Sequence, residues 1–183
     1  ILGWSPKIVH IINELVIANE SRKKPRIVIL AEEDKVEMED ELRAKITDTQ
    51  NTKIICSTGS QLDLVDLDVV NPHEARSIIV ISQEQENADT FVIKAVLALT
   101  NNPRRKKEKY HIVAEIKEEA NMEAALLVGG DEAIFVLSPD LTARVTAQTC
   151  RQSGLSIVYS QLLCYEGDEM YFSHEPVLTG KTF

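Results

Sequence analysis

Short apolar runs alternate with longer amphipathic stretches along most of this chain, and this alternation is the strongest constraint on its fold. The runs are four or five residues long and rich in Ile and Val, which is typical of strands covered on both faces. The stretches between them repeat apolar residues at helical spacing. A doubly wound α/β fold is therefore predicted. The clearest runs are 27–30, 53–56, 77–81, 110–114 and 133–136.

A sixth strand is expected at the start of the chain, where Ile1 and Leu2 precede Gly3. An ordinary strand has about five or six residues, so we interpret this one as truncated. Because the chain also lacks an initiator Met, we expect it to be a trimmed domain of a longer protein. The predicted architecture is a Rossmann-like sheet of six parallel strands whose first strand is incomplete.

The pattern changes near residue 138. Ser138 and Pro139 are typical of a helix start, with Ser as the cap, and an apolar helix is expected over 140–150. A second apolar helix is expected over 157–163, after Gly154. We predict a Rossmann-like lobe over 1–137, a helix–turn–helix crossover over 138–165 and the start of a C-terminal lobe over 166–183.

These two C-terminal helices have more apolar surface than the short segment after them can cover. Pairing with a second domain is the predicted solution, and packing against a C-terminal lobe outside this chain is the alternative. The predicted interface residues are Leu141, Val145, Leu155, Val158, Leu162 and Leu163.

Net charge and cysteine content narrow the class of protein. With a net charge of −9, the molecule as a whole is expected to repel nucleic acid and anionic membranes. No apolar run approaches the roughly 20 residues that span a bilayer. Cys56, Cys150 and Cys164 show no CxxC spacing, which favours reduced, mostly buried thiols in the cytosol.

The charged residues are distributed unevenly between the two edges of the predicted sheet. Acidic residues at 32–34 and at Glu84 and Glu86 follow strands, whereas basic residues at 22–26 and 104–109 precede them. Loops that leave parallel strands form the ligand-binding edge, so we predict an acidic ligand edge and a basic opposite edge. Such polarity suits a cation or an adenosine on one side and anionic lipid or an acidic partner on the other. Solvated loop charges are the simpler interpretation.

The first turn contains part of a dinucleotide-binding signature. Gly3 supplies a tight turn before a helix, and Glu32 ends the second strand, where an acid would bind a ribose. Ser5 and Ile8 occupy the second and third glycine positions of the fingerprint, and Trp4 is bulky. A scaffold turn without a ligand is therefore the alternative.

No pattern in the chain indicates catalysis. The four histidines are scattered, and neither a P-loop nor a nucleophile elbow is present. His111 is expected to be a packed residue inside a strand. Asp63, Asp66 and Asp68 are expected on the solvated face of a short helix over 62–70.

With these elements in this order, the chain resembles the RCK domain (also called the KTN or TrkA-N domain), a Rossmann-type module that regulates K⁺ conductance. The resemblance extends over nearly all of the chain. It rests on the segments 1–5, 30–34, 58–60, 67–82 and 127–133 and on the two C-terminal helices. Within the family, the segments 1–4, 15–21 and 56–60 are most similar to the CASTOR and POLLUX ion channels and their bacterial relatives.

The resemblance implies a cytosolic, ligand-sensing domain that gates a cation channel. Its partners would be further RCK domains in a dimer or ring and a transmembrane pore in the same or a partner chain. Nucleic acid is not an expected partner. The implied cofactor-binding positions are Gly3, Trp4, Ser5, Glu32, Gly59 and Ser60.

Calcium and an adenine nucleotide are the candidate ligands. Just after the second C-terminal helix, Glu166, Asp168 and Glu169 offer oxygen atoms for Ca²⁺. Two other classes remain open. A soluble K⁺-uptake regulator similar to TrkA would act as a separate subunit, and an NAD-dependent oxidoreductase would need a substrate lobe with a general acid or base. The expected protein is the cytoplasmic domain of a membrane protein and not an enzyme.

Overall fold

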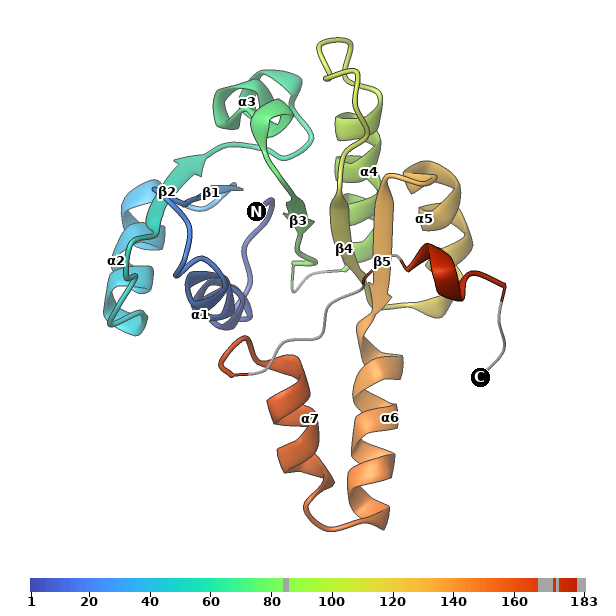
Figure 1. The fold of residues 1–183 in the computed structure, drawn as a ribbon. Helices are drawn as coiled ribbons and strands as arrows, with labels where there is room; N and C mark the ends of the chain where they lie inside the picture. Colours follow the sequence, from blue (N-terminus) through green and yellow to red (C-terminus); the bar gives the residue numbers. More distant parts are fainter. Residues whose placement is uncertain (84–85, 168–172, 174, 181–183) are drawn as a thin grey trace.

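The computed structural model describes residues 1–183 except 84–85, 168–172, 174 and 181–183, and it shows parallel strands flanked by helices (Figure 1). The strands of the described residues are β1 (Arg26–Ala31), β2 (Lys53–Thr58), β3 (Ile78–Val80), β4 (Ile112–Ile116) and β5 (Ala133–Leu137). β1 pairs with β2, and β3, β4 and β5 form a three-stranded sheet in that order. All of these pairs are parallel, which confirms the predicted mixed α/β class.

Helices alternate with these strands along the chain. They are α1 (Ile8–Ala18), α2 (Lys35–Lys45), α3 (Leu64–Val70), α4 (Ala88–Thr100), α5 (Met122–Gly129), α6 (Ser138–Arg151) and α7 (Leu155–Leu163). Short 3₁₀ turns lie at Pro72–Glu74, Glu119–Asn121 and Pro176–Leu178. Asp34 caps α2 and Asp63 caps α3, because each carboxylate accepts backbone N–H groups of the first turn.

Among the described residues, the predicted sheet of six strands appears as a two-stranded and a three-stranded sheet. The first strand is reduced to Leu2, which makes isolated parallel bridges to Leu30 of β1 and Val80 of β3. The Leu2 amide donates to the Ile79 carbonyl at 2.8 Å, and the Leu2 carbonyl accepts from the Ile81 amide at 2.9 Å. Since so short a segment cannot form a ladder, a two-stranded and a three-stranded sheet meet at one residue.

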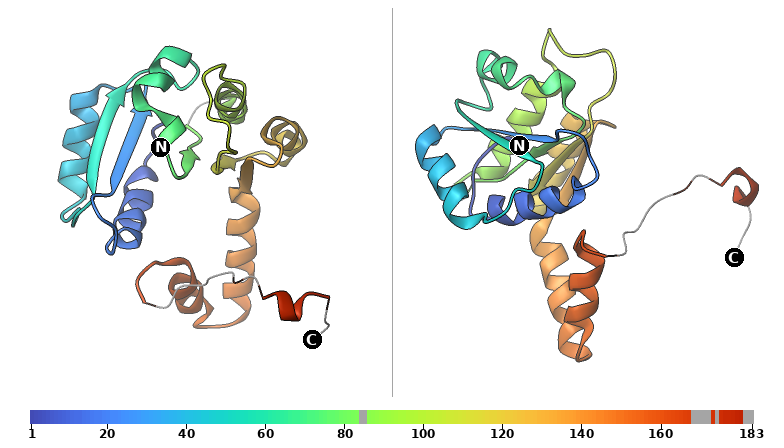
Figure 2. Two further views of the ribbon diagram at one scale, coloured as in Figure 1. Left: turned by 45° about the horizontal axis from the view of Figure 1, so that its top comes forward. Right: turned by 60° about the vertical axis from the view of Figure 1, so that its left-hand side comes forward.

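Helices cover both faces of the strands, and adjacent strand residues point to opposite faces. Ile29 packs with the buried side chains of α1 and α2, whereas Leu30 belongs to the cluster under α3, α4 and α5. Figure 2 shows α1 and α3 on opposite sides of β1 and β2. Each cluster is dominated by Ile, Leu and Val, so burial of these side chains supplies the main driving force for the fold.

The two C-terminal helices stand away from this core. α6 leaves β5 and α7 returns beside it, so the pair projects as a hairpin below the strands in Figure 1. Neither helix has a buried residue. Ser138 is not the cap of α6, as predicted, but its first residue, and its hydroxyl donates to Glu115 Oε1 at 2.6 Å.

The sequence-based expectations about His111, Cys150 and Asp68 are wrong. His111 is exposed because β4 begins one residue later. Cys150 is also exposed, although Cys56 is buried as expected, and burial raises the pKa of the Cys56 thiol to about 11. Asp68 is not on a freely solvated face, since it forms an ion pair with Arg104 and accepts a hydrogen bond from Asn102 at 3.5 Å.

Three basic side chains of the loop before β4 have acidic partners, Arg104 among them through Asp68. Arg105 donates two hydrogen bonds to Glu132, at 2.9 and 2.7 Å, and Lys109 pairs with Asp131. The Tyr110 amide also donates to Glu132 Oε2 at 2.8 Å. Burial alone would raise the pKa of Glu132, but these hydrogen bonds outweigh it and hold that pKa below its ordinary value.

Replacing Glu132 with Gln should therefore remove both stability and part of its pH dependence. A carboxylate whose pKa is lower in the folded state stabilises above its ordinary pKa of 4.5 and loses that contribution as pH falls. We expect Glu132→Gln to lower the free energy of unfolding at pH 7 by about 1–3 kcal/mol. We also expect a shallower loss below pH 4.5 than in the unmodified protein. Urea titrations at a series of pH values measure the free energy of unfolding at pH 7 and its loss below pH 4.5. Asp131→Asn, in an exposed pair, is the control and should change little.

Candidate functional site

The candidate ligand site is built at the edge where the strands end and the next helices begin. Gly3 sits there with φ +99°, a backbone conformation that favours glycine. A Cβ at this position would lie 2.7 Å from the Ile81 carbonyl oxygen and 3.2 Å from Gln61 Oε1. The Gly3 amide also donates to the Leu30 carbonyl at 2.9 Å. The first turn is thus closely packed between β1 and β3, and glycine is required.

We expect Gly3→Ala to lower the free energy of unfolding by at least about 2 kcal/mol, since it adds both backbone strain and a clash. Gly154→Ala is the matched control, because Gly154 also has positive φ, at +88°, but a Cβ there meets nothing within 4 Å. Denaturant titration of both variants separates the two contributions. An equal loss for both would contradict the close packing of the first turn.

The two residues after Gly3 have different environments. Ser5 is only 4% exposed, and its hydroxyl oxygen has no hydrogen-bond partner among the described residues. The Ser5 carbonyl accepts from the Ile8 amide at 3.0 Å, which places Ser5 at the entrance to α1. Trp4 is half-buried against the apolar cluster of α1 and α2. Its ring therefore has a packing role in addition to the ligand role that the resemblance implies.

The structure brings Glu32 and Ser60 together, as the predicted site requires. Ser60 Oγ donates to Glu32 Oε1 at 2.9 Å, across the ends of β1 and β2. The Ser60 amide donates to Asp66 Oδ2 at 2.8 Å, and a Cβ on Gly59 would lie 2.8 Å from Asp66 Cγ. Asp66 is therefore a structural residue that fixes this turn, and not the solvated carboxylate that was expected.

Two buried polar residues at this edge were missed by the sequence reading. Gln61 is 3% exposed and faces Gly3, and Ser82, 1% exposed, follows β3. Gln61 follows the turn after β2, and Ser82 lies just past the end of β3. Polar residues of a parallel sheet gather at such positions, so their places in the sequence could have predicted them. Together with Ser5, they place three buried polar side chains near the first turn, next to the core.

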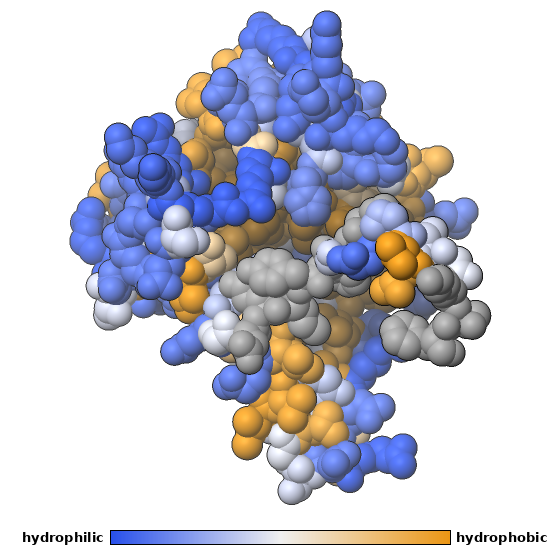
Figure 3. All heavy atoms as spheres, in the orientation of Figure 1, coloured by the Kyte–Doolittle hydropathy of each residue, from blue (hydrophilic) through white to orange (hydrophobic). Residues whose placement is uncertain are grey.

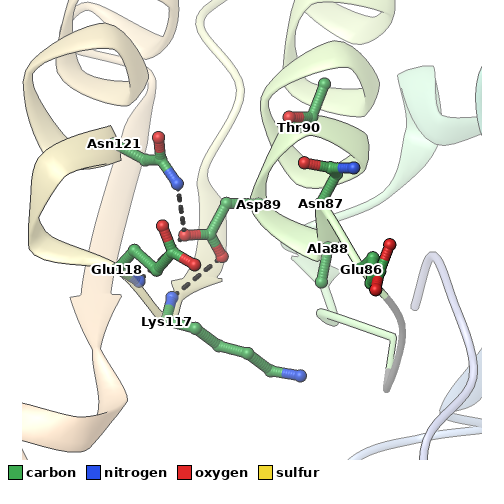
Figure 4. Close-up of a pocket in the computed structure, with 8 residues that line it drawn as sticks. All are labelled: Glu86, Asn87, Ala88, Asp89, Thr90, Lys117, Glu118 and Asn121. Carbon is green, nitrogen blue, oxygen red and sulfur yellow. Dashed lines mark hydrogen bonds between the residues drawn. The ribbon is translucent and has the colours of Figure 1, made fainter.

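A hollow lies between the start of α4 and the loop after β4 (Figure 4). It has a volume of about 390 Å³ and is lined by Glu86, Asn87, Ala88, Asp89, Thr90, Lys117, Glu118 and Asn121. The Asp89 carboxylate is buried and accepts hydrogen bonds of 2.9 Å from the Lys117 and Glu118 amides and from Asn121 Nδ2. Asp89 thus ties α4 to this loop and gives the hollow its shape.

Replacing Asp89 with Ala should open this hollow. We expect a loss of about 2 kcal/mol or more, because two amides and Asn121 lose a charged acceptor. Hydrogen exchange should speed up at the Lys117 and Glu118 amides, while exchange in β1 stays unchanged. Glu86→Ala, at an exposed residue of the same hollow, is the control and should leave both readouts unaltered.

Of the predicted calcium ligands, only Glu166 belongs to the described residues, and it lies outside this edge. Glu166 is exposed beyond the end of α7, while Asp168 and Glu169 fall outside the described residues. Within the described part of the chain, no group of three or more His, Cys, Asp or Glu side chains is arranged to hold a metal ion.

The predicted interface residues lie on the projecting hairpin of α6 and α7. Leu141, Val158, Leu162 and Leu163 are 49–65% exposed, and Val145 and Leu155 are partly exposed. Figure 3 shows the apolar surface that this hairpin presents. The chain itself therefore leaves these side chains uncovered in its described part.

Comparison with protein families identifies the class. Residues 4–122 match the model of the calcium-activated potassium channel slowpoke-like RCK domain. Residues 139–183 match a second model, described as Castor and Pollux, part of voltage-gated ion channel. The chain belongs to the RCK domain family, as its sequence predicted.

Among curated proteins, the chain is similar to plant ion channels. The probable ion channel CASTOR of Oryza sativa is 37% identical over the whole chain, which covers 20% of that relative. The ion channel CASTOR of Lotus japonicus is 36% identical and the probable ion channel POLLUX of Arabidopsis thaliana 35%, again over the whole chain and over 22% of each relative. The predicted likeness to CASTOR and POLLUX is confirmed. The chain spans about a fifth of the length of these relatives.

No helix in the described residues is both long and apolar enough to cross a membrane.

Proposed function

We propose that this chain is a cytosolic, ligand-sensing domain that gates a cation channel. Its membership of the RCK family and its likeness to proteins named as ion channels support the channel assignment. A ligand bound where the strands end would shift the equilibrium between two arrangements of an RCK assembly. The shift is set by the difference in the ligand's affinity for the two arrangements.

The observation that carries this proposal is the connection between the first turn and the projecting hairpin. Lys7, which directly precedes α1, forms an ion pair with Glu115 on β4. The same Glu115 oxygen accepts the hydroxyl hydrogen bond of Ser138, the first residue of α6. At the other end of the hairpin, the Tyr165 amide donates to Glu14 of α1 at 3.0 Å. Both ends of the hairpin therefore depend on the position of α1.

The proposed sensing event is a displacement of α1 by ligand at the first turn. Gly3, Trp4 and Ser5 lead directly into this helix. A ligand that contacts the turn is therefore close to the start of the Lys7–Glu115–Ser138 contacts, which we call the relay. An adenine nucleotide would use Glu32, Gly59 and Ser60 as well. A Ca²⁺ ion would instead use Glu166, Asp168 and Glu169, next to the Tyr165 contact with α1.

The hairpin is proposed to pair with a second copy of the domain. Its exposed apolar residues continue onto β5, where Ile134 is 56% and Val136 36% exposed. Covering this surface with the same surface of another copy would form a symmetric dimer, and repetition would form a ring. The transmembrane pore would lie in the same or a partner chain.

Ligand binding is tested by thermal unfolding of the protein with Ca²⁺, Mg²⁺, NAD, ADP and ATP in separate concentration series. A ligand at about 100 times its Kd should stabilise by about 2.7 kcal/mol. A nucleotide shift should disappear in Glu32→Ala. Failure of every ligand to stabilise the protein would overturn the sensing role.

Coupling is tested with Glu115→Gln, which weakens the relay and leaves the first turn intact. We expect the variant to bind the active ligand with unchanged Kd but to lose the ligand-dependent change in hydrogen exchange of α6. In single-channel recordings of the parent channel, the variant should also show a smaller effect of the ligand on open probability. Arg144→Gln, which removes an exposed ion pair on α6, is the matched control. An unchanged ligand response in Glu115→Gln would exclude this relay.

A further inference from the structure

Five basic side chains gather at the edge where β1 and β2 begin. They are Arg22, Lys23, Lys24, Arg26 and Lys53, and we call them the basic edge surface. All five are exposed. This surface lies at the opposite end of β1 and β2 from the candidate ligand site, so the gating proposal does not use it.

Backbone contacts hold the two loops of this surface side by side. Arg26 and Lys53 are register partners in the parallel pair of strands, and the Lys53 amide donates to the Pro25 carbonyl at 3.0 Å. Asn51 Nδ2 donates to the Arg22 carbonyl at 2.7 Å and to the Glu20 carbonyl at 3.1 Å. The cationic groups are therefore concentrated by the fold itself.

The five cations form no ion pair within the described part of the chain. Two carboxylates, Glu20 and Asp48, lie on the same loops, and Asp48 is engaged with the Gln50 amide at 2.7 Å. The other basic loop differs, because Arg104, Arg105 and Lys109 have acidic partners, which leaves Lys106 and Lys107 outside the ion pairs found among the described residues. The basic edge surface therefore keeps more unpaired positive charge than the loop before β4.

The net charge of −9 does not cancel this local field. The acidic residues that follow β1 are separated from the basic edge surface by a strand of six residues, which is about 20 Å long. Electrostatic screening at physiological salt has a length of about 8 Å. A planar anionic surface at this edge would therefore interact mainly with the cations.

The composition of the surface selects among anionic partners. None of the exposed large apolar side chains in the described part of the chain belongs to these two loops, so the surface lacks anchors of the kind that dominate protein interfaces. The segments 19–26 and 46–53 contain no aromatic residue on which a base could stack. Phospholipid headgroups require neither. We propose that the basic edge surface binds anionic phospholipid at a membrane.

Co-sedimentation with vesicles tests the proposal. We expect the protein to bind vesicles of phosphatidylcholine with about 30% phosphatidylserine, and not phosphatidylcholine alone. Since one basic residue contributes about fivefold to such binding, Lys23→Glu/Lys24→Glu should weaken it at least about twentyfold. The control Lys35→Glu/Lys94→Glu makes the same change in net charge at the start of α2 and within α4, and should weaken binding much less.

Two further measurements separate the alternatives. Binding should fall as salt is raised from about 0.05 to 0.2 M, because the attraction is screened. Circular dichroism must show that both double variants fold alike. Equal weakening by both variants, or binding to free inositol phosphate without binding to vesicles, would overturn the assignment to a membrane surface. Binding to an acidic protein but not to vesicles would also overturn it.

Discussion

Parallel pairing through a single residue is the constraint on which the rest of the structure depends. The amide and carbonyl of Leu2 bond to β3, whereas the Ile1 carbonyl and the Gly3 amide on either side of it bond to Leu30 of β1, so the two small sheets share one point of registration. The space between them is so narrow that Gly3 has no room for a side chain. The direction in which the chain leaves this point sets the position of α1. Glu14 of α1 contacts Tyr165 at the end of the C-terminal hairpin, and Lys7, just before α1, is linked to the start of the hairpin through Glu115.

The sequence predicted the elements well, because burial on both faces gives parallel strands an unmistakable apolar pattern. It could not predict how the first strand would pair, since Ile1 and Leu2 have no pattern of their own. His111 was misplaced for a related reason: the run 110–114 is shifted by two residues from the observed β4, and strand ends are set by tertiary contacts.

Only those features of the candidate site that depend on position along the chain could be predicted. Glu32 and Ser60 could be foreseen because each follows a strand, and the structure brings them within hydrogen-bond distance. Asp66 and Asp89 could not, because a carboxylate that accepts backbone N–H groups from a distant loop looks like any solvated acid in the sequence. The same limit applies to the basic loop before β4, whose ion pairs depend on partners far along the chain.

The hairpin of α6 and α7 has a mechanical consequence. α6 has 14 residues and is therefore about 21 Å long, and it is held to the core near its first turn. A rotation of about 10° at that base would move its far end by nearly 4 Å over this length. Rearrangements at the first turn that are too small to disturb the core would thus become displacements as large as a side chain at the tip. The contact between Ser138 and Glu115 is the point about which α6 would turn.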